Sequence, residues 1–239
     1  MPVPRLFLDH PLAEGQEVPL SPEQAHYLFG VMRLALGARV LVFNGREGEW
    51  AAQVAEAARR GGALRAVGQT RAQEVPPDLH LLFAPIKKAR TDFIVEKAAE
   101  MGCRRVRPVQ TERTNSERVN AARLRLHAVE AAEQCGNTFV PEVDDLRRLG
   151  DALAGWEAGR SLWFCDETLA GGAGGLPERA EGPGAVLIGP EGGFSEGERA
   201  RLRGLSFARP IRLGPRILRA DTAAVAALAL WQAVNGDWR

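Results

Sequence analysis

The stretch GAVLIGPEGGFSEGERARLRGLSFARPIRLGPRILRADTA, residues 184–223, decides the fold. It contains the same order of signals twice: an apolar run, a Gly/Pro turn and the start of a helix. The first round has a short strand pattern at 185–188, ended by the turn at 189–193. The second has alternating apolar residues at 211–213, then Gly-Pro, then an apolar helix expected from about 221 to 234. This order of strand, loop and helix is typical of an α/β sheet.

The two loops suit a ligand. Glycines let a backbone approach a ligand without a Cβ in the way, and ligands of open α/β sheets bind at the carboxyl ends of the strands. Ser195 and Glu198 form the capping-box pattern that starts the helix after the first loop. The loops lack the lysine of a phosphate-binding P-loop, and the chain has no G-x-G-x-x-G motif. The residues alone predict a ligand-binding edge without naming the ligand, and two tight turns with no ligand are the alternative.

Length and composition limit the class of protein. The chain has 239 residues, a net charge of +1 and 45% hydrophobic residues, which allows one large domain or two small ones. The first ten residues hold no long apolar segment, and no apolar run reaches the ~20 residues that a membrane helix needs. The three cysteines are widely spaced and form no metal-binding pattern. These features predict a reduced, cytoplasmic protein without a membrane partner or a metal.

The charges are unevenly distributed. Residues 149–198 hold nine acidic and two basic side chains, whereas residues 199–219 hold seven arginines and no acid. Arginine suits bidentate phosphate contacts and stacking on bases. A solvated helix face explains any single arginine, but the cluster beside the Gly/Pro loops favours a polyanionic substrate.

Residues 1 to about 70 predict a small, mostly β unit. A capping-box pattern from Ser21 to Gln24, with Pro22 at the first helical position, opens a helix that extends to about Leu36. Strand patterns occupy residues 5–8, 39–43, 50–57 and 64–69, with a turn at Asn44-Gly45.

A linker is expected at Pro76-Pro77, between two differently patterned regions. Beyond it, strand and helix patterns alternate, which favours a parallel α/β sheet. The expected strands are 79–86, 106–109 and 161–165, the expected helices are 91–102, 117–135 and 144–153, and a flexible loop is expected at 171–175.

The motifs LIGPEGGFS (187–195) and LGPRILRADT (213–222) resemble the paired signature of the RsmE family of 16S rRNA uridine-N3 methyltransferases, in the SPOUT superfamily. PIKKARTDFIVEKAAEMG (85–102), PVQTERT (108–114) and EAAEQCGNTFVPEV (130–143) are similar to further family motifs, so the resemblance covers nearly the whole chain. The departures are Thr114 and Cys135 where the family has Ser, Asn137 where it has Arg, and Asp221 where many members have Glu.

The resemblance implies an α/β fold in two domains. Residues 1–72 would form a small PUA-like RNA-binding β-barrel, and residues 73–239 a SPOUT methyltransferase domain with a C-terminal trefoil knot. The implied activity is S-adenosylmethionine-dependent methylation of N3 of a uridine in the decoding region of 16S rRNA, within the 30S subunit. Knotted SPOUT domains generally pair beside their cofactor sites, and the last helix is apolar on most faces, so a homodimer is expected.

Two other functions stay open. One is a SPOUT-type methyltransferase that acts on a tRNA, on another RNA position or on a protein. The other is a non-catalytic rRNA-binding assembly factor, against which the two glycine loops argue.

The cofactor is expected between the two glycine loops. Adenine needs a flat apolar slot with backbone donors and acceptors on its edge, and these loops can supply both. The residues expected to bind S-adenosylmethionine are Ile188, Gly189, Pro190, Glu191, Gly192, Gly193, Leu213, Gly214, Ile217 and Leu218.

The expected reaction places further demands on the site. Uridine N3 carries a proton at neutral pH and lies on the pairing edge, so the nucleotide must be unpaired and rotated into a pocket. Arg219, in the L-R-x-[ED]-T pattern, is expected to stabilise the negative charge that develops on the uracil. Asp221 is expected as proton acceptor, as orienter of Arg219 or as N-cap of the last helix. RNA contacts are expected from Arg5, Arg33, Lys87, Arg113 and Arg216.

Overall fold

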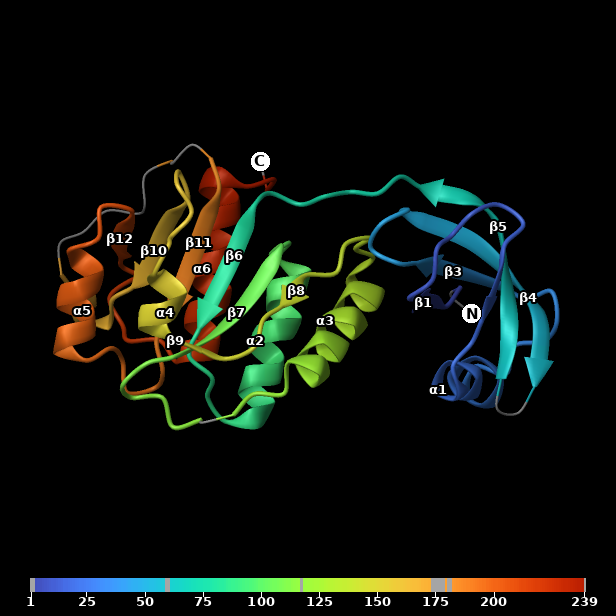
Figure 1. Ribbon diagram of the computed structural model, residues 1–239, viewed down its shortest axis with the longest axis horizontal. Coiled ribbons are helices and arrows are strands. Elements are labelled where there is room, and N and C mark those ends of the chain that lie inside the picture. Colours follow the sequence, from blue (N-terminus) through green and yellow to red (C-terminus); the bar gives the residue numbers. More distant parts are fainter. Residues whose placement is uncertain (1–2, 59–60, 117, 173–178, 180–181, 239) are drawn as a thin grey trace. The chain divides into compact units, whose positions relative to one another are not determined.

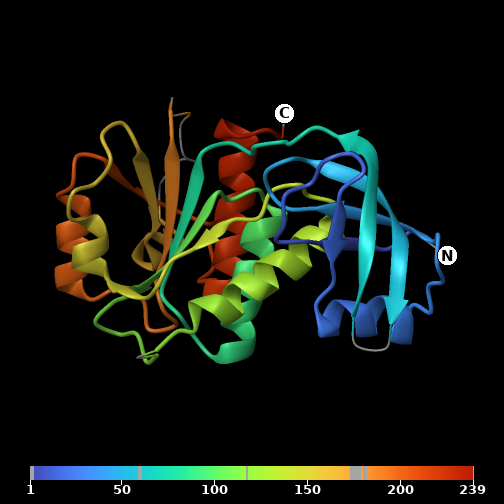
Figure 2. The same cartoon turned by 45° about the vertical axis from the view of Figure 1, so that its right-hand side comes forward.

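The computed structural model describes residues 3–58, 61–116, 118–172, 179 and 182–238. The chain forms two compact units (Figures 1 and 2). The first contains residues 1–75 and 132–140, and the second contains residues 76–131 and 141–239. The boundary expected at residue 72 lies close to the end of the first long segment, but it leaves out residues 132–140.

The first unit is built on one sheet. Among the described residues, five strands lie in the order β1–β3–β4–β5–β2, with β1 parallel to β3 and the other pairs antiparallel. Alternation of apolar residues turns one face inward, so Val40, Val42 and Val54 are buried in its core. The strands are β1 (Arg5–Phe7), β2 (Glu17–Pro19), β3 (Arg39–Phe43), β4 (Glu49–Ala58) and β5 (Gly61–Arg71).

The helix of the first unit is shorter than expected. The capping box predicted at Ser21 is present, since its hydroxyl accepts from Gln24 N and the Gln24 side chain accepts from Ser21 N. However, α1 (Pro22–Ala25) passes into a wider π-helical segment, η1 (His26–Val31), and does not reach Leu36. Arg33 follows with a φ of +55°, a left-handed conformation that ends the helix.

Residues 132–140 complete the first unit through the side chain of Arg5. Its Nη1 donates to the carbonyl of Ala132 at 2.6 Å, and its Nη2 donates to that of Asn137 at 2.7 Å. Its Nε donates to Glu49 at 2.7 Å, and the guanidinium lies 3.9 Å from the centre of the Phe43 ring. Arg5 therefore joins β1, β3 and β4 to a segment more than a hundred residues away in sequence.

The second unit is a parallel α/β sheet. In the part of the chain that the structure describes, seven strands take part, in the order β12–β10–β11–β6–β7–β8, with β9 beside β7. Each neighbouring pair runs parallel, as the strand–helix alternation predicts. The strands are β6 (Leu79–Phe83), β7 (Arg105–Gln110), β8 (Glu142–Val143), β9 (Arg147–Arg148), β10 (Ser161–Cys165), β11 (Gly184–Ile188) and β12 (Ala208–Ile211).

Helices cover both faces of this sheet. Leu149 and Leu153 of α4 and Leu202 of α5 join the apolar cluster on one face. On the other face, Trp231 of α6 lies against Gly184 of β11, and α6 lies beside α2 (Figures 1 and 2). The helices are α2 (Lys88–Glu100), α3 (Ala121–Cys135), α4 (Leu149–Leu153), α5 (Glu196–Arg203) and α6 (Ala220–Asn235), with a 3-10 turn, η2 (Glu167–Leu169).

Several element boundaries differ from the sequence expectation. The helix expected from residue 117 begins at Ala121, and residue 117 itself lies outside the described residues. The helix expected from residue 144 begins only at Leu149, after two short strands. Of the loop expected at 171–175, residues 173–175 lie outside the described residues. No helix among the described residues is long and apolar enough to cross a membrane.

Candidate active site

A cavity of about 460 Å³ lies at the carboxyl ends of β10, β11 and β12, where the two glycine loops meet. The arrow of β6 points downward in Figure 1, so this edge of the parallel sheet is the lower edge of the second unit. Nine of the ten residues expected to bind the cofactor line the cavity. The tenth, Gly192, does not line it, and its carbonyl instead accepts a hydrogen bond from Nη1 of Arg113 at 2.8 Å.

The first glycine loop needs its glycines for space. A Cβ on Gly189 would come within 3.1 Å of the Phe194 ring. Gly193 has a φ of +67°, and a Cβ there would overlap Oε1 of Glu167. The loop is therefore held close to its neighbours by residues that have no side chain, which leaves its backbone groups accessible from the cavity.

Among the residues of the cavity wall that were not foreseen are Cys165, the last residue of β10, and Asp166 and Glu167, which follow it. Two carboxylates next to a predicted strand end were a signal for them. Nη1 of Arg199 donates to Glu167 Oε1 at 2.8 Å and to the carbonyl of Phe194 at 2.5 Å. Arg199, at the start of α5, therefore fixes Glu167 against the first glycine loop.

The charge states of these residues differ. Burial raises the pKa of the Cys165 thiol, with a smaller contribution from Glu167, so the sulfur stays protonated. Burial also opposes ionisation of Asp166, but hydrogen bonds from Thr168 and Arg203 outweigh it and hold the pKa of this carboxyl below its usual range. Arg203 donates to Asp166 at 2.5 Å. Asp166 is therefore a fixed anion that anchors the η2 turn.

The two expected catalytic residues have different surroundings in the structure. Arg219 lines the cavity, is exposed and occupies the N-cap position of α6. Asp221 does not occupy that position, so the interpretation of Asp221 as helix cap is wrong: its carboxylate accepts from Thr222 N. Asp221 faces Arg90 of α2 at 3.6 Å, and Arg90 donates to Glu191 of the first glycine loop at 2.7 Å. Arg90, which also lines the cavity, was not singled out from the sequence.

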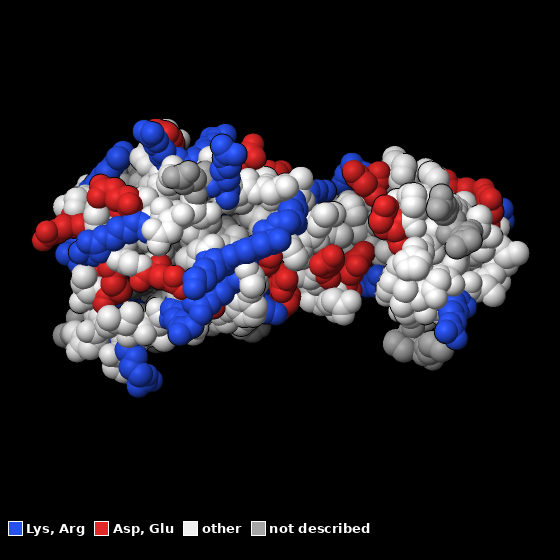
Figure 3. Space-filling model, turned by 90° about the horizontal axis from the view of Figure 1, so that it is seen from below, with Lys and Arg blue, Asp and Glu red and all other residues white. Residues whose placement is uncertain are grey.

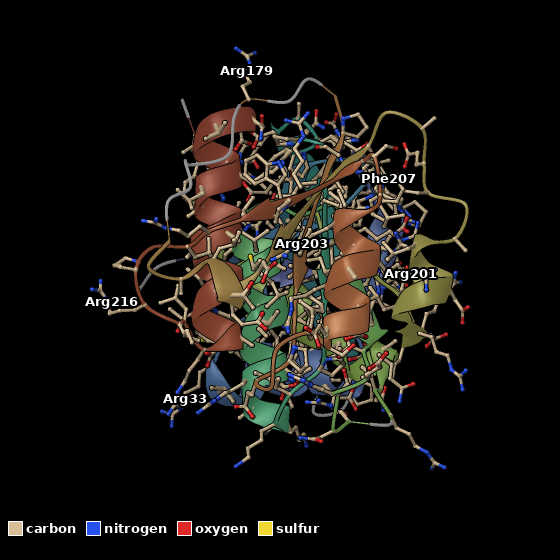
Figure 4. The ribbon with its side chains drawn as sticks, turned by 90° about the vertical axis from the view of Figure 1, so that its left-hand side faces the viewer. Arg33, Arg179, Arg201, Arg203, Phe207 and Arg216 are labelled. Atoms are coloured by element: carbon tan, nitrogen blue, oxygen red, sulfur yellow. The ribbon has the colours of Figure 1, made fainter. Side chains whose placement is uncertain are left out.

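The residues expected to contact RNA occupy different environments. Lys87 and Arg216 line the cavity, and Arg216 projects from its loop in Figure 4. Arg113 extends along the first glycine loop. In the first unit, Arg33 is exposed. Arg5 is only slightly exposed, and its three guanidinium nitrogens donate to protein oxygens, so the geometry gives it a structural role.

The cavity fits a nucleoside-containing cofactor. Its volume lies within the 300–1,000 Å³ usual for small-molecule sites. Ile188, Leu213 and Leu218 give it an apolar wall, whereas Ile217 is 74% exposed and adds little to it. Glu167 offers an anionic acceptor of the kind that ribose hydroxyls bind. Within the described residues, no group of three or more His, Cys, Asp or Glu could hold a metal ion.

The fold and this site define a class of enzyme that uses a nucleoside-containing cofactor, and comparison with known families identifies it. The model of the RNA methyltransferase domain family matches residues 73–232, and that of the RNA methyltransferase PUA domain matches residues 20–64. The chain therefore belongs to the RNA methyltransferase family, and the resemblance to RsmE seen in its motifs is confirmed.

Individual relatives agree with this assignment. The ribosomal RNA small subunit methyltransferase E of Synechocystis is 31% identical over 89% of this chain and 71% of its own length. The protein of the same name from Rickettsia conorii is 27% identical over 94% of this chain and 93% of its own. The crystal structure of ribosomal RNA small subunit methyltransferase E from Neisseria gonorrhoeae, bound to S-adenosylmethionine, matches with a TM-score of 0.89 at 26% identity, covering 99% of this chain and 100% of that one.

Proposed function

We propose that this protein is an S-adenosylmethionine-dependent methyltransferase that modifies N3 of a uridine in the decoding region of 16S rRNA. The observation that carries the proposal is the cavity between the two glycine loops, which has an apolar wall on one side and arginines at its mouth. The relatives named as small subunit rRNA methyltransferases, and the Neisseria gonorrhoeae structure with its bound cofactor, support it.

The cofactor, when bound, supplies an electrophilic methyl group. Ile188, Leu213 and Leu218 would hold its adenine, and the backbone of the first glycine loop would contact the edge of the ring. Glu167, fixed by Arg199, would accept hydrogen bonds from the ribose hydroxyls.

The protein's own residues would then prepare the uridine. Loss of the N3 proton leaves negative charge on the uracil, and Arg219 at the cavity rim is placed to stabilise it. Asp221 would accept the proton or orient a cation, and the cation that it faces is Arg90. Arg90 is thus a positioning residue that ties Asp221 and Glu191 to one guanidinium.

We include the finer points of the family resemblance in this proposal. The second unit would be a SPOUT domain with a trefoil knot, preceded by a PUA-like RNA-binding unit, and it would act as a cytoplasmic homodimer. The preferred substrate would be the assembled 30S particle, since a net charge of +1 is low for capture of naked RNA by charge alone. A monomer in light scattering at micromolar concentration would contradict the dimer.

Primer extension tests the proposed activity, because a methyl group on N3 stops reverse transcriptase. The 30S particles, isolated without this modification, are incubated with protein and S-adenosylmethionine. We expect one new stop, at a uridine of the decoding region. Stops at another position, or on tRNA, would assign a different RNA substrate. Tight particle binding without any methyl transfer would indicate a non-catalytic assembly factor.

A further inference from the structure

Two hollows continue from the cavity along the carboxyl edge of the second unit. One has a volume of about 300 Å³ and the other of about 610 Å³. The loop after β6 and the loop before α3 form both of them. The cavity and the smaller hollow share three lining residues, Lys87, Pro190 and Glu191. The two hollows share three others, Pro85, Ile86 and Ser116. The two hollows therefore lie next to the cavity along one edge of the sheet, and together we call them the channel.

The channel is strongly positive. Lys87 and Arg113 line the smaller hollow, and Lys88, Arg118 and Arg123 line the larger one. Figure 3 views this edge of the unit, and lysine and arginine side chains gather in a band across it. Among the lining residues that the structure describes, Glu191 is the carboxylate of the smaller hollow, and the larger hollow has none.

The cations of the larger hollow are only partly neutralised from elsewhere. Arg123 forms an ion pair with Asp92 at 2.7 Å, and His127 lies 3.5 Å from the same carboxylate. In the described part of the chain, no carboxylate lies within ion-pair distance of Lys88 or Arg118. Asp92 acts on Lys88 through its charge but pairs with Arg123, so Lys88 and Arg118 have no ion-pair partner among the described residues. The first turns of α2 and α3 border the same hollow and add a partial positive charge.

Other arginine-lined hollows of the unit differ in charge balance. The hollow beside β9 contains Arg147 and Arg148 together with Asp145 and Asp151. The hollow beside α5 contains Arg201 together with acids that include Glu198. Neutralisation inside these hollows makes them poor sites for a polyanion. By contrast, the described lining of the channel combines five cations with one carboxylate, that of Glu191.

The lining also indicates which part of a nucleic acid would lie there. Single-stranded bases are usually held by stacking on aromatic side chains. Among the described lining residues the larger hollow has no aromatic side chain, and its apolar lining consists of Pro85, Ile86 and Val119. Cations without stacking partners position a backbone and do not read its sequence. We infer that this channel seats the sugar–phosphate backbone of the RNA strand that carries the target nucleotide, with Lys88 and Arg118 as phosphate contacts.

This inference rests on the proposed function, and its test separates the two. The double variant Lys88→Ala/Arg118→Ala is compared with Arg148→Ala/Arg179→Ala, which removes the same charge elsewhere. Arg148 is exposed and shares the hollow beside β9 with Asp145 and Asp151, and Arg179 projects from the opposite edge of the unit in Figure 4. Binding to unmodified 30S particles is measured at several salt concentrations, together with single-turnover methylation at saturating particles and binding of S-adenosylmethionine.

We expect the channel variant to bind particles about 10–30-fold more weakly near 0.1 M salt, and its salt slope to fall by about 1.4 for two single-strand phosphate contacts. Cofactor binding and the saturated rate should stay at the wild-type level, and the control variant should behave as wild type. Unchanged affinity and slope in the channel variant, or an equal loss in the control, would overturn the inference. If the wild-type protein binds particles but methylates none, the proposed function fails while the affinity comparison still decides the channel.

Discussion

Substitution of Arg5 distinguishes a structural arginine from an RNA contact. The Arg5 and Glu49 side chains are only 11% and 7% exposed, so Arg5→Ala would leave the Glu49 carboxylate buried without its cation. Removal of one partner from a buried ion pair typically costs about 3–5 kcal/mol. The same change also leaves the carbonyls of Ala132 and Asn137 without this donor. We expect the first unit to lose roughly that amount of stability, whereas Arg33→Ala, at an exposed position, should lose less than about 0.5 kcal/mol.

The loss should depend on pH. Burial opposes ionisation of Glu49, but hydrogen bonds from Arg5 and Thr70 and the charges of Arg5 and Arg71 outweigh it, so the pKa of Glu49 lies below its ordinary value of 4.5. The wild-type pair therefore stabilises the fold above pH 4.5, and this stabilisation is lost as pH falls through the lower folded-state pKa. The deficit of Arg5→Ala should be largest at neutral pH and smaller near pH 4.

Hydrogen exchange on peptides from β3, β4 and β5 measures the stability of the first unit separately from the second. A companion change, Glu49→Gln, should recover part of the loss in the Arg5→Ala background, because a neutral amide is less costly to bury than a carboxylate. A deficit below about 1 kcal/mol, or one that Glu49→Gln leaves unchanged, would refute the reasoning. Weaker 30S binding with full stability would return Arg5 to the RNA contacts.

Three further predictions concern the second unit. Arg219→Ala should lower the single-turnover rate of methylation by about 10²–10³-fold, with cofactor affinity and melting temperature nearly unchanged and partial rescue at higher pH. Weakened 30S binding with an intact chemical step would instead show that Arg219 is a phosphate contact. Gly193→Ala should weaken S-adenosylmethionine binding about tenfold or more in calorimetry, because its Cβ would displace Glu167 and strain the backbone. The control Gly197→Ala, at an exposed position of α5 with no close neighbour, should leave the affinity intact. Equal effects of the two substitutions would refute the role given to Gly193. Burial and the charge of Arg160 lower the pKa of His80 from 6.5 to about 4, so the free energy of unfolding should fall by roughly 2–3 kcal/mol between pH 7 and 4.5. Urea unfolding of the His80→Gln variant should show a smaller fall over the same pH range than the wild-type protein.

Local sequence signals predicted most of the fold. Alternation located β3 and β10 with their observed ends, and the side chains at Ser21 and Ser195 form the capping boxes that their spacing indicated. Both patterns depend on neighbours a few residues apart, so the sequence displays them directly. The glycine loops were equally visible, because their function depends on the absence of side chains.

The features that sequence reasoning missed depend on distant contacts. The pairing of Asp221 with Arg90 joins the start of α6 to α2, and no spacing within either segment indicates it. The position of Arg5 depends on carbonyls near the end of α3. The early end of the first helix has a local cause, the change to a π-helical turn, but helix propensity does not report the width of a turn.

The inclusion of residues 132–140 in the first unit bears on how such a protein can change by recombination. A crossover at the linker near Pro76-Pro77 would transfer residues 1–75 without the segment that Arg5 and Arg71 bind. A transplanted N-terminal piece would then carry Arg5 and Arg71 without the carbonyls that accept from them, and the recipient would keep a nine-residue segment without its sheet. Each unit is compact, but neither consists of one continuous stretch of sequence. Exchange of the first unit among these enzymes would therefore require two coordinated junctions, or a compatible segment already present in the recipient.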